Sequence, residues 1–311
     1  MSLRVVFFGT PEFAVPTLSR LVETGSRVSL VVSRPDRPVG RHAKAVPPAI
    51  ALAAAGYGLD VVKPEKLRGN AELIDRLRDA LPDVGVVVAY GKMLPAEVLA
   101  LPRLGFVNLH ASLLPKYRGA SPVQAALLAG EGETGVVTMR VVDELDAGPL
   151  YLTRRVAIDE REDAASLSGR LARVGADLVV ETLAGLEAGT LAGKPQKGTP
   201  SFCRPIRRED GEIDWTRPAA EIERRLRAFT PWPGVYTFAA GERVKILSAR
   251  TGPATERAPG SLWREGDRLL VAAGDGTSLE LERLQRSGHR VVSAGEFARS
   301  SRDTTSRFGR A

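Results

Sequence analysis

The chain has 311 residues, of which 43% are hydrophobic and 26% charged, with a formal net charge of +7 and a single cysteine, Cys203. This length favours two domains. The lone cysteine excludes a disulfide framework and a cysteine-based zinc site, and is best interpreted as a small packing residue. No apolar run approaches the roughly 18 residues of a membrane span and no signal-peptide pattern is present, so we expect a cytoplasmic protein. The positive charge favours a nucleic-acid partner, although an arginine-rich solvated surface is the plain alternative.

Strand and helix patterns alternate through the first 189 residues. Apolar runs predict buried strands at 4–8, 27–33, 59–64, 84–91 and 106–110. Helices are predicted at 12–25, 49–56, 71–82 and 96–100, with Gly25 as a C-cap. Two more strands follow at 135–142 and 149–158, and then a long helix over 163–189 that begins with Asp163 as its cap. The alternation predicts a Rossmann-like α/β fold with a doubly wound, mostly parallel sheet.

The pattern changes after residue 189. Residues 190–208 are rich in Pro, Gly, Lys and Arg, which is typical of a linker. A helix is predicted at 219–230, followed by short strands with glycine-bearing turns at 234–241, 242–250, 260–266, 268–276 and 278–285. We therefore expect an N-terminal domain at 1–189, a basic linker at 190–208, and a small all-β barrel or sandwich at 209–311. This last domain resembles an OB-like barrel, a fold that commonly receives nucleic acid. Within this domain, Trp232 is expected to be a buried core anchor, with a stacking platform as the alternative.

Three predicted strand ends suggest a ligand site. The first strand is followed by "GTPEF" (9–13), which lacks the G-x-G-x-x-G pattern and so disfavours a dehydrogenase. The strand at 84–91 ends in Ala-Tyr-Gly. The strand at 106–110 carries Asn108 and His110 on one face. Carboxyl ends of parallel strands form the ligand-binding edge of such sheets, so we expect both side chains to face a crevice. The plain alternative for His110 is a core histidine satisfied by backbone groups.

An acidic loop supplies a third group. Asp143, Glu144 and Asp146 precede Gly148 and Pro149, which mark a turn. If this loop folds back over the crevice, Asp146 can orient His110 and raise its basicity; otherwise these acids are ordinary solvated charges. Two histidines and an acid at metal-ligand spacing are absent from the sequence, so we expect no metal.

These residues also carry a family resemblance. The segments "NLHASLLPKYRGASP" (108–122) and "DELDAGP" (143–149) together resemble the signature of the formyltransferases that use 10-formyltetrahydrofolate. A second set of segments is similar to the branch of that family that formylates initiator methionyl-tRNA: "FFGTPEFAVPTL", "RPDRPVGR", "VVAYGKMLP", "DGEIDW" and "AFTPWPGVY". The similarity extends from residue 4 to about residue 292.

The resemblance implies both an activity and the residues that perform it. The formyl group of 10-formyltetrahydrofolate would pass to the amino group of methionyl-tRNA, for translation initiation. Asn108 and protonated His110 would donate hydrogen bonds to the oxyanion, Asp146 would support proton transfer, and no covalent intermediate would form. Leu94, Leu113 and Leu114 would be apolar walls for the pterin, and Phe13 would line the methionine pocket. The full implied folate set is Val88, Ala89, Tyr90, Gly91, Leu94, Ser112, Leu113, Leu114, Pro115, Glu144, Leu145 and Asp146.

Basic residues outside the crevice are candidates for tRNA contact. The stretch 34–48 is expected to be a loop, and the resemblance implies that it is an arm that orders on the acceptor stem; a solvated loop is the alternative. The candidate residues are Arg34, Arg37, Arg41 and Lys44 in this arm, and Lys194, Lys197, Arg204 and Arg207 in the linker.

Two rival functions remain at this point. An enzyme that formylates a small or nucleotide-sugar amine would have a smaller C-terminal part and no basic arm. A non-catalytic RNA-binding protein would have lost Asn108 or His110. The chain has no exposed apolar heptad or obvious pairing edge, so a monomer without a protein partner is expected.

Overall fold

The computed structural model describes residues 3–38, 45–300 and 307–309, and the chain divides into two compact units. The N-terminal unit comprises Met1–Pro122, Glu133–Ala157 and Ser168–Arg204. The C-terminal unit comprises Val123–Gly132, Ile158–Leu167 and Pro205–Ala311. Among the described residues, the helices are all too short or too polar to cross a lipid bilayer.

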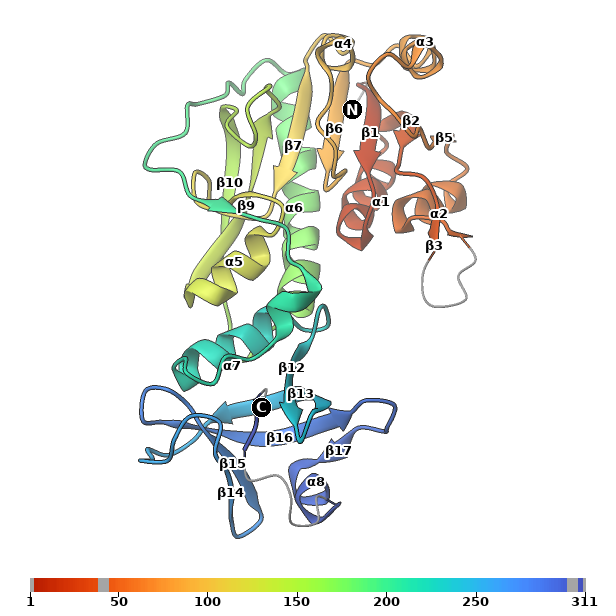
Figure 1. Ribbon diagram of the computed structural model, residues 1–311. Helices are drawn as coiled ribbons and strands as arrows, with labels where there is room; N and C mark the ends of the chain where they lie inside the picture. The colour runs from red at the N-terminus through yellow and green to blue at the C-terminus, as the bar shows by residue number, and fades with distance from the viewer. Residues whose placement is uncertain (1–2, 39–44, 301–306, 310–311) are drawn as a thin grey trace. The chain divides into compact units, whose positions relative to one another are not determined.

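A seven-stranded sheet in the order β10-β9-β7-β6-β1-β2-β5 forms the centre of the N-terminal unit (Figure 1). The parallel strands are β1 (Arg4–Gly9), β2 (Arg27–Val32), β5 (Val61–Val62), β6 (Val84–Val88) and β7 (Phe106–His110). Antiparallel partners extend it on one side: β9 (Glu133–Arg140) pairs with β7, and β10 (Leu150–Ala157) with β9. The predicted mostly parallel, Rossmann-like sheet is therefore confirmed.

Helices cover both faces of this sheet. They are α1 (Val15–Glu23), α2 (Ala49–Gly56), α3 (Ala71–Asp79), α4 (Ala96–Leu99) and α6 (Ala164–Glu187). Helix α6 lies along β7 and β9 (Figure 1), where the hydroxyls of Thr138 and Thr182 are hydrogen-bonded at 2.7 Å. On the opposite face, Phe106 of β7 shares a buried cluster with Leu73 of α3 and Val98 of α4. Two other helical elements precede residue 133. The 3₁₀ turn η1 (Glu12–Ala14) lies within the helix predicted at 12–25, and α5 (Pro122–Ala129) was not predicted.

Two short strand pairs were also not predicted. β3 (Arg37–Pro38) pairs with β4 (Ala45–Val46) inside the stretch expected to be a loop. β8 (Arg118–Gly119) pairs in parallel with β11 (Phe202–Cys203), and Leu150 and Lys194 exchange two backbone hydrogen bonds of 2.8 Å. Most of the expected linker is therefore held against the N-terminal unit, because its backbone groups find partners there.

The C-terminal unit is built on an antiparallel sheet, as predicted. Its main strands, in the order β12-β13-β16-β15-β14, are β12 (Val235–Ala239), β13 (Glu242–Thr251), β16 (Ser278–Arg286), β15 (Arg268–Ala272) and β14 (Leu262–Glu265). β17 (Val292–Ser293) pairs with β16, and the helical elements are η2 (Arg208–Gly211), α7 (Ala219–Ala228) and α8 (Ala294–Ser300). Phe308 forms a bridge with Ala239 of β12, and Arg307 forms one with Ser261, which precedes β14. One short segment thus contacts both edges of the sheet.

The prediction that Trp232 is buried is wrong. Its side chain is 55% exposed, in the turn where the backbone N–H of Gly234 donates to the carbonyl of Phe229. Phe229 occupies the core instead. The buried tryptophan of this unit is Trp215, whose Nε1 donates to Oγ1 of Thr237 at 2.9 Å. A polar partner within reach of the indole N–H is what allows a tryptophan to be buried.

Candidate active site

His110 and Asp146 lie together at the carboxyl end of β7. Nδ1 of His110 is 3.7 Å from Oδ2 of Asp146. Nε2 of His110 donates a hydrogen bond to the carbonyl oxygen of Tyr117 at 3.0 Å, because a carbonyl can only accept. Burial holds the pKa of His110 below its usual value, although the Asp146 carboxylate and the hydrogen bond to Tyr117 both oppose this by raising it. Since Nε2 is engaged, Nδ1 is the ring nitrogen that can exchange a proton with a substrate.

Asn108 lies on the same face of β7 as His110. Side chains alternate along a strand, and Leu109, between the two, packs against Gly175 of α6 on the opposite face. The Asn108 side chain is half-buried and makes no hydrogen bond to another described residue. Its amide is therefore available to donate to a substrate oxygen beside His110.

The loop between β9 and β10 folds back onto this end of β7. The sequence analysis gave this arrangement as the condition for Asp146 to orient His110. The backbone N–H of Gly119 donates to Oδ2 of Asp146 at 2.8 Å. Gly148 lies so close to the end of β9 that a Cβ atom there would overlap the carbonyl oxygen of Arg140. Asp146 itself has a left-handed backbone, with φ of 48°. The loop can turn back this tightly because Gly148 has no side chain and Asp146 adopts a left-handed backbone conformation.

The segment after β7 is fixed by β11. The backbone N–H of Arg118 donates to the carbonyl of Ser201 at 2.8 Å, and that of Tyr117 to Oγ of Ser201 at 2.9 Å. Gly119 has φ of 122°, and a Cβ there would overlap the carbonyl oxygen of Cys203. The Cys203 thiol lies against the carbonyls of Tyr117 and Arg118, and burial raises its pKa. A packing role for this cysteine fits these contacts.

The predicted folate residues lie on three segments at or next to this edge of the sheet: the end of β6, the turn after β7 and the β9–β10 loop. Several of them are internal. Leu94 packs in the cluster that contains Phe106, and Leu114 packs with Val137 and Met139, so both leucines are buried in the core. Leu113 is half-buried against Gly135 of β9.

The other predicted folate residues differ in how exposed they are to solvent. Val88 and Ser112 are fully buried, and Oγ of Ser112 donates to the carbonyl of Lys116 at 2.6 Å. Ala89, Gly91, Glu144 and Leu145 are exposed, and Pro115 is half-buried. What these segments present to a ligand therefore includes Ala89 and Gly91, which have little or no side chain, and the exposed side chains of Glu144 and Leu145.

Arg34 and Tyr90 meet at the end of β6. Burial raises the pKa of Tyr90 to about 12, and the charge of Arg34 opposes this. The guanidinium of Arg34 lies against Gly91, and neither its buried Nε nor the Tyr90 hydroxyl has a hydrogen-bond partner among the described residues. Arg34, expected on a tRNA-binding arm, is thus half-buried at the strand end. Phe13 is half-buried in η1, which follows β1.

Most of the other basic candidates are exposed. Arg37, Lys194, Lys197 and Arg204 are exposed in the N-terminal unit, and Arg207 is exposed in the C-terminal unit. Arg207 also lies 3.9 Å from Glu209. Arg41 and Lys44 lie outside the described residues.

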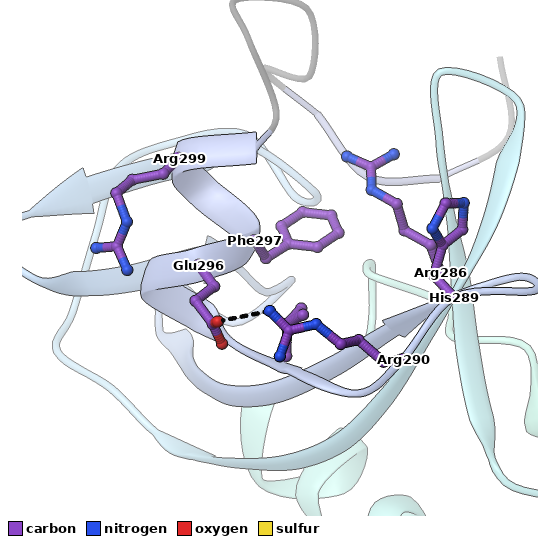
Figure 2. A pocket seen from close by; sticks show the side chains of 7 residues that line it. Arg286, His289, Arg290, Glu296, Phe297 and Arg299 are labelled. Atoms are coloured by element: carbon purple, nitrogen blue, oxygen red, sulfur yellow. Dashed lines mark hydrogen bonds and ion pairs between the residues drawn. The ribbon is translucent and has the colours of Figure 1, made fainter.

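A cavity of about 500 Å³ lies in the C-terminal unit beside α8 (Figure 2). Its lining includes Arg286, Arg290 and Glu296. Arg290 is directed at Glu296 across the cavity, 3.1 Å away, and Arg286 lies 2.7 Å from Glu242. Because these two arginines already have acidic partners, the cavity attracts anions less strongly than its basic residues alone would indicate.

Sequence reasoning missed Tyr117, Arg118, Ser201 and Gln196. Nε2 of Gln196 donates to the carbonyls of Asp146 (2.7 Å) and Gly148 (3.0 Å). Gln196 is separated from Asp146 by 50 residues and lies in the stretch expected to be a linker. No local signal in the sequence distinguishes it.

Comparisons with known proteins agree with this geometry. The chain matches the formyl transferase family over residues 3–183 and the formyl transferase C-terminal domain over residues 205–302. It is 46% identical over 298 residues to a methionyl-tRNA formyltransferase of Thermus thermophilus, covering 96% of each chain. It is 44% identical over 308 residues to one of Koribacter versatilis, covering 98% of each.

A solved structure shows the same fold. The Helicobacter canadensis N-formyltransferase, in complex with folinic acid and dTDP-3-aminofucose, superposes with a TM-score of 0.65 at 16% identity, over 92% of this chain and all of that one. On the strength of the full-length relatives, the chain belongs to the methionyl-tRNA formyltransferase family.

Proposed function

We propose that this chain transfers the formyl group of 10-formyltetrahydrofolate to the free amino group of initiator methionyl-tRNA, producing N-formylmethionyl-tRNA. The observation that carries the proposal is the His110–Asp146 pair, whose Nδ1 and Oδ2 atoms are 3.7 Å apart. The Asn108 side chain, which makes no hydrogen bond to another described residue, lies on the same face of β7. The chain also resembles methionyl-tRNA formyltransferases over nearly its full length. An amide, an imidazole and a carboxylate at one strand end are the groups that acyl transfer to an amine requires.

Each of the three residues has a defined task in this reaction. The Asn108 amide donates to the formyl oxygen as it becomes an oxyanion, a contact whose loss typically costs a factor of about 10²–10³ in turnover. Nδ1 of protonated His110 donates to the same oxygen, and the Asp146 carboxylate balances the charge. The bond between the amine and the formyl carbon forms, the bond from that carbon to the folate nitrogen breaks, and Asp146 supports the transfer of one proton from the amine to the departing nitrogen. The α-amine is already partly neutral near pH 7, so a modest base is sufficient.

Three segments at this edge of the sheet are proposed to bind the folate. Ala89 and Gly91 have left-handed backbones, with φ of 47° and 80°, and both are exposed beyond β6. Leu145 is 47% exposed on the loop that carries Asp146. A flat pterin requires apolar contact and edge-on hydrogen bonds, and exposed backbone with one apolar side chain fits that need. The proposed segments are 88–91, 112–115 and 144–146.

The exposed basic residues are proposed to contact tRNA phosphates. Arg37, Lys194, Lys197, Arg204 and Arg207 carry this role, and the net charge of +7 supports it. Arg34, beside Gly91, is proposed to meet the acceptor end close to the folate site. Phe13 is proposed to line the methionine pocket. Arg41 and Lys44 remain predictions.

The C-terminal unit is proposed to be an OB-like barrel that receives the tRNA. The bridges from Phe308 to β12 and from Arg307 to Ser261 support closure, because they connect the two edges of the sheet. We further propose the division into a catalytic domain at 1–189, a connecting segment at 190–208 and the barrel at 209–311. We also propose that the protein is a monomer. A charged tRNA as substrate supports work in the cytoplasm.

The test is release of tetrahydrofolate with three acceptors offered separately: methionyl-tRNA, glycinamide ribonucleotide and a nucleotide amino-sugar. We expect turnover with methionyl-tRNA alone. Turnover only with a small amine would retain the chemistry at Asn108 and His110 and overturn the proposed acceptor. His110→Ala should abolish turnover while tRNA binding persists. An equal loss of binding would contradict a catalytic role for this residue.

A further inference from the structure

The carboxamide of Gln196 has a complete set of hydrogen bonds. Its Nε2 donates to the carbonyls of Asp146 and Gly148 at 2.7 and 3.0 Å. Its Oε1 accepts from Nη2 and Nε of Arg118 at 2.9 and 3.3 Å. A carboxamide has two N–H donors and two acceptor lone pairs, and all of them are engaged here. The position therefore requires a glutamine, and not merely a polar residue.

Arg118 determines which way this carboxamide points. Its side chain is nearly buried, 10% exposed, and its Nη1 lies 2.9 Å from Oε1 of Glu144. A guanidinium only donates, so the carboxamide oxygen of Gln196 must face it. The carboxamide nitrogen must then face the Asp146 loop. The backbone of Arg118 is itself fixed by pairing with β11.

Asp146 is held from two sides as a result. Its left-handed backbone, φ of 48°, is unfavourable for a residue with a side chain and persists only where the surroundings enforce it. Gly119 binds the carboxylate and Gln196 binds the carbonyl of the same residue. Releasing the carbonyl frees the backbone to leave this conformation, and the carboxylate would then move away from His110.

We infer that Gln196, oriented by Arg118, is a positioning residue for formyl transfer: it holds Asp146 in the conformation that directs its carboxylate at His110. The inference rests on the proposed function. Gln196 acts through Asp146, and its expected effect is on turnover more than on substrate affinity. A displacement of about 1 Å in a reacting group can cost a factor of about 10² in rate.

Two variants separate positioning from packing. Gln196→Met keeps the length of the side chain and removes every hydrogen bond. Gln196→Glu keeps an acceptor for Arg118 and gains an ion pair with it, but replaces the donor nitrogen with an oxygen that faces the carbonyls of Asp146 and Gly148. Gln285→Met is the matched control, because Gln285 also donates Nε2 to a backbone carbonyl, that of His289 at 2.9 Å, in the C-terminal unit.

We expect Gln196→Met to lower kcat about 10–100-fold with little change in KM for either substrate. Gln196→Glu should lose at least as much activity as Gln196→Met, but it should unfold at the same denaturant concentration as the parent. Gln285→Met should keep the parental kcat. Parental turnover in Gln196→Met, or losses in both Gln196 variants that simply follow the fraction of unfolded protein, would overturn the inference.

A readout independent of activity is the titration of the His110 ring by NMR. The chain has three histidines, and the His110 signal is the one absent from His110→Ala. Because the Asp146 carboxylate raises the pKa of His110 against burial, the pKa should fall in Gln196→Met. The other groups near this pair include the Cys203 thiol and the Arg118–Glu144 ion pair, and both remain in that variant. An unchanged titration would overturn the inference.

The failure of the proposed function can be distinguished from the failure of this inference. If the parent uses a small amine in place of methionyl-tRNA, the proposed acceptor is wrong. The Gln196 variants are then compared with that amine, and the histidine titration requires no acceptor.

Discussion

Replacing Asp146 with asparagine removes one charge from the proposed site and keeps the size of the side chain. At the observed 3.7 Å from His110 Nδ1, two unit charges at an effective dielectric constant of about 20 interact by about 4 kcal/mol. The Asp146 side chain is only 11% exposed, so solvent screens this interaction little. A loss of that size in the stabilisation of protonated His110 corresponds to a fall in kcat of about 10³.

The pH dependence of Asp146→Asn has a definite sign. The carboxylate raises the pKa of His110, and burial lowers it. In the variant the hydrogen bond to Tyr117 still raises the pKa of His110, but the contribution of the carboxylate is lost, so the pKa should fall below the parental value. If transfer requires the protonated ring, the alkaline decline of kcat should begin at lower pH in the variant than in the parent.

The assay is steady-state release of tetrahydrofolate across mildly acidic to neutral pH, because burial holds the pKa of His110 below its usual value, with binding of methionyl-tRNA measured separately. Asp143→Asn, an exposed acid of the same loop, is the control and should retain the parental kcat. Parental turnover by Asp146→Asn, or an equal loss in Asp143→Asn, would refute the reasoning.

Three further predictions follow from other parts of the structure. Leu114→Ala should lower the free energy of unfolding by about 2–5 kcal/mol in denaturant titrations, because Leu114 is buried; a change confined to KM for the formyl donor would instead indicate a ligand contact. Arg37→Ala should weaken tRNA binding and reduce the slope of log K against log salt by about 1; an unchanged slope in filter-binding titrations would contradict a phosphate contact. Hydrogen bonds from the Arg4 backbone and the Arg103 side chain lower the pKa of Asp83 to about 2. Asp83→Asn should therefore cost about 2 kcal/mol of stability at neutral pH, and this difference should vanish as the pH falls from about 4 through 2; a difference that persists at lower pH would rule out this origin.

Features decided by one local pattern could be predicted from the sequence. The apolar run at 106–110 predicted β7, and the period of two placed Asn108 and His110 on one face. Asp163 caps α6 as expected, since its Oδ1 accepts from the backbone N–H of Ser166 at 2.8 Å. These features depend on residues within a few positions of one another, so the pattern that determines them can be read in one short stretch of sequence.

Features that depend on contacts between distant segments could not be predicted. The stretch 190–208 has the composition of a linker, yet much of its backbone pairs with residues as far away as 118 and 150. Gln196 contacts Arg118 and Asp146 because this stretch folds back against segments that are distant in the sequence. Burial of individual side chains is similarly hidden: Leu114 and Trp232 are both apolar, but packing against β9 buries the first, and a turn exposes the second.

The pairing of β8 with β11 also bears on the order in which the chain matures during synthesis. All seven strands of the central sheet are complete by Ala157. A nascent chain that ends before residue 196 can therefore assemble the sheet, yet it lacks the carboxamide and the strand that complete the surroundings of Asp146. Contacts across such long separations form late, because closing a long loop costs conformational entropy before any contact forms. We therefore expect the scaffold to form before the reactive centre is completed during synthesis.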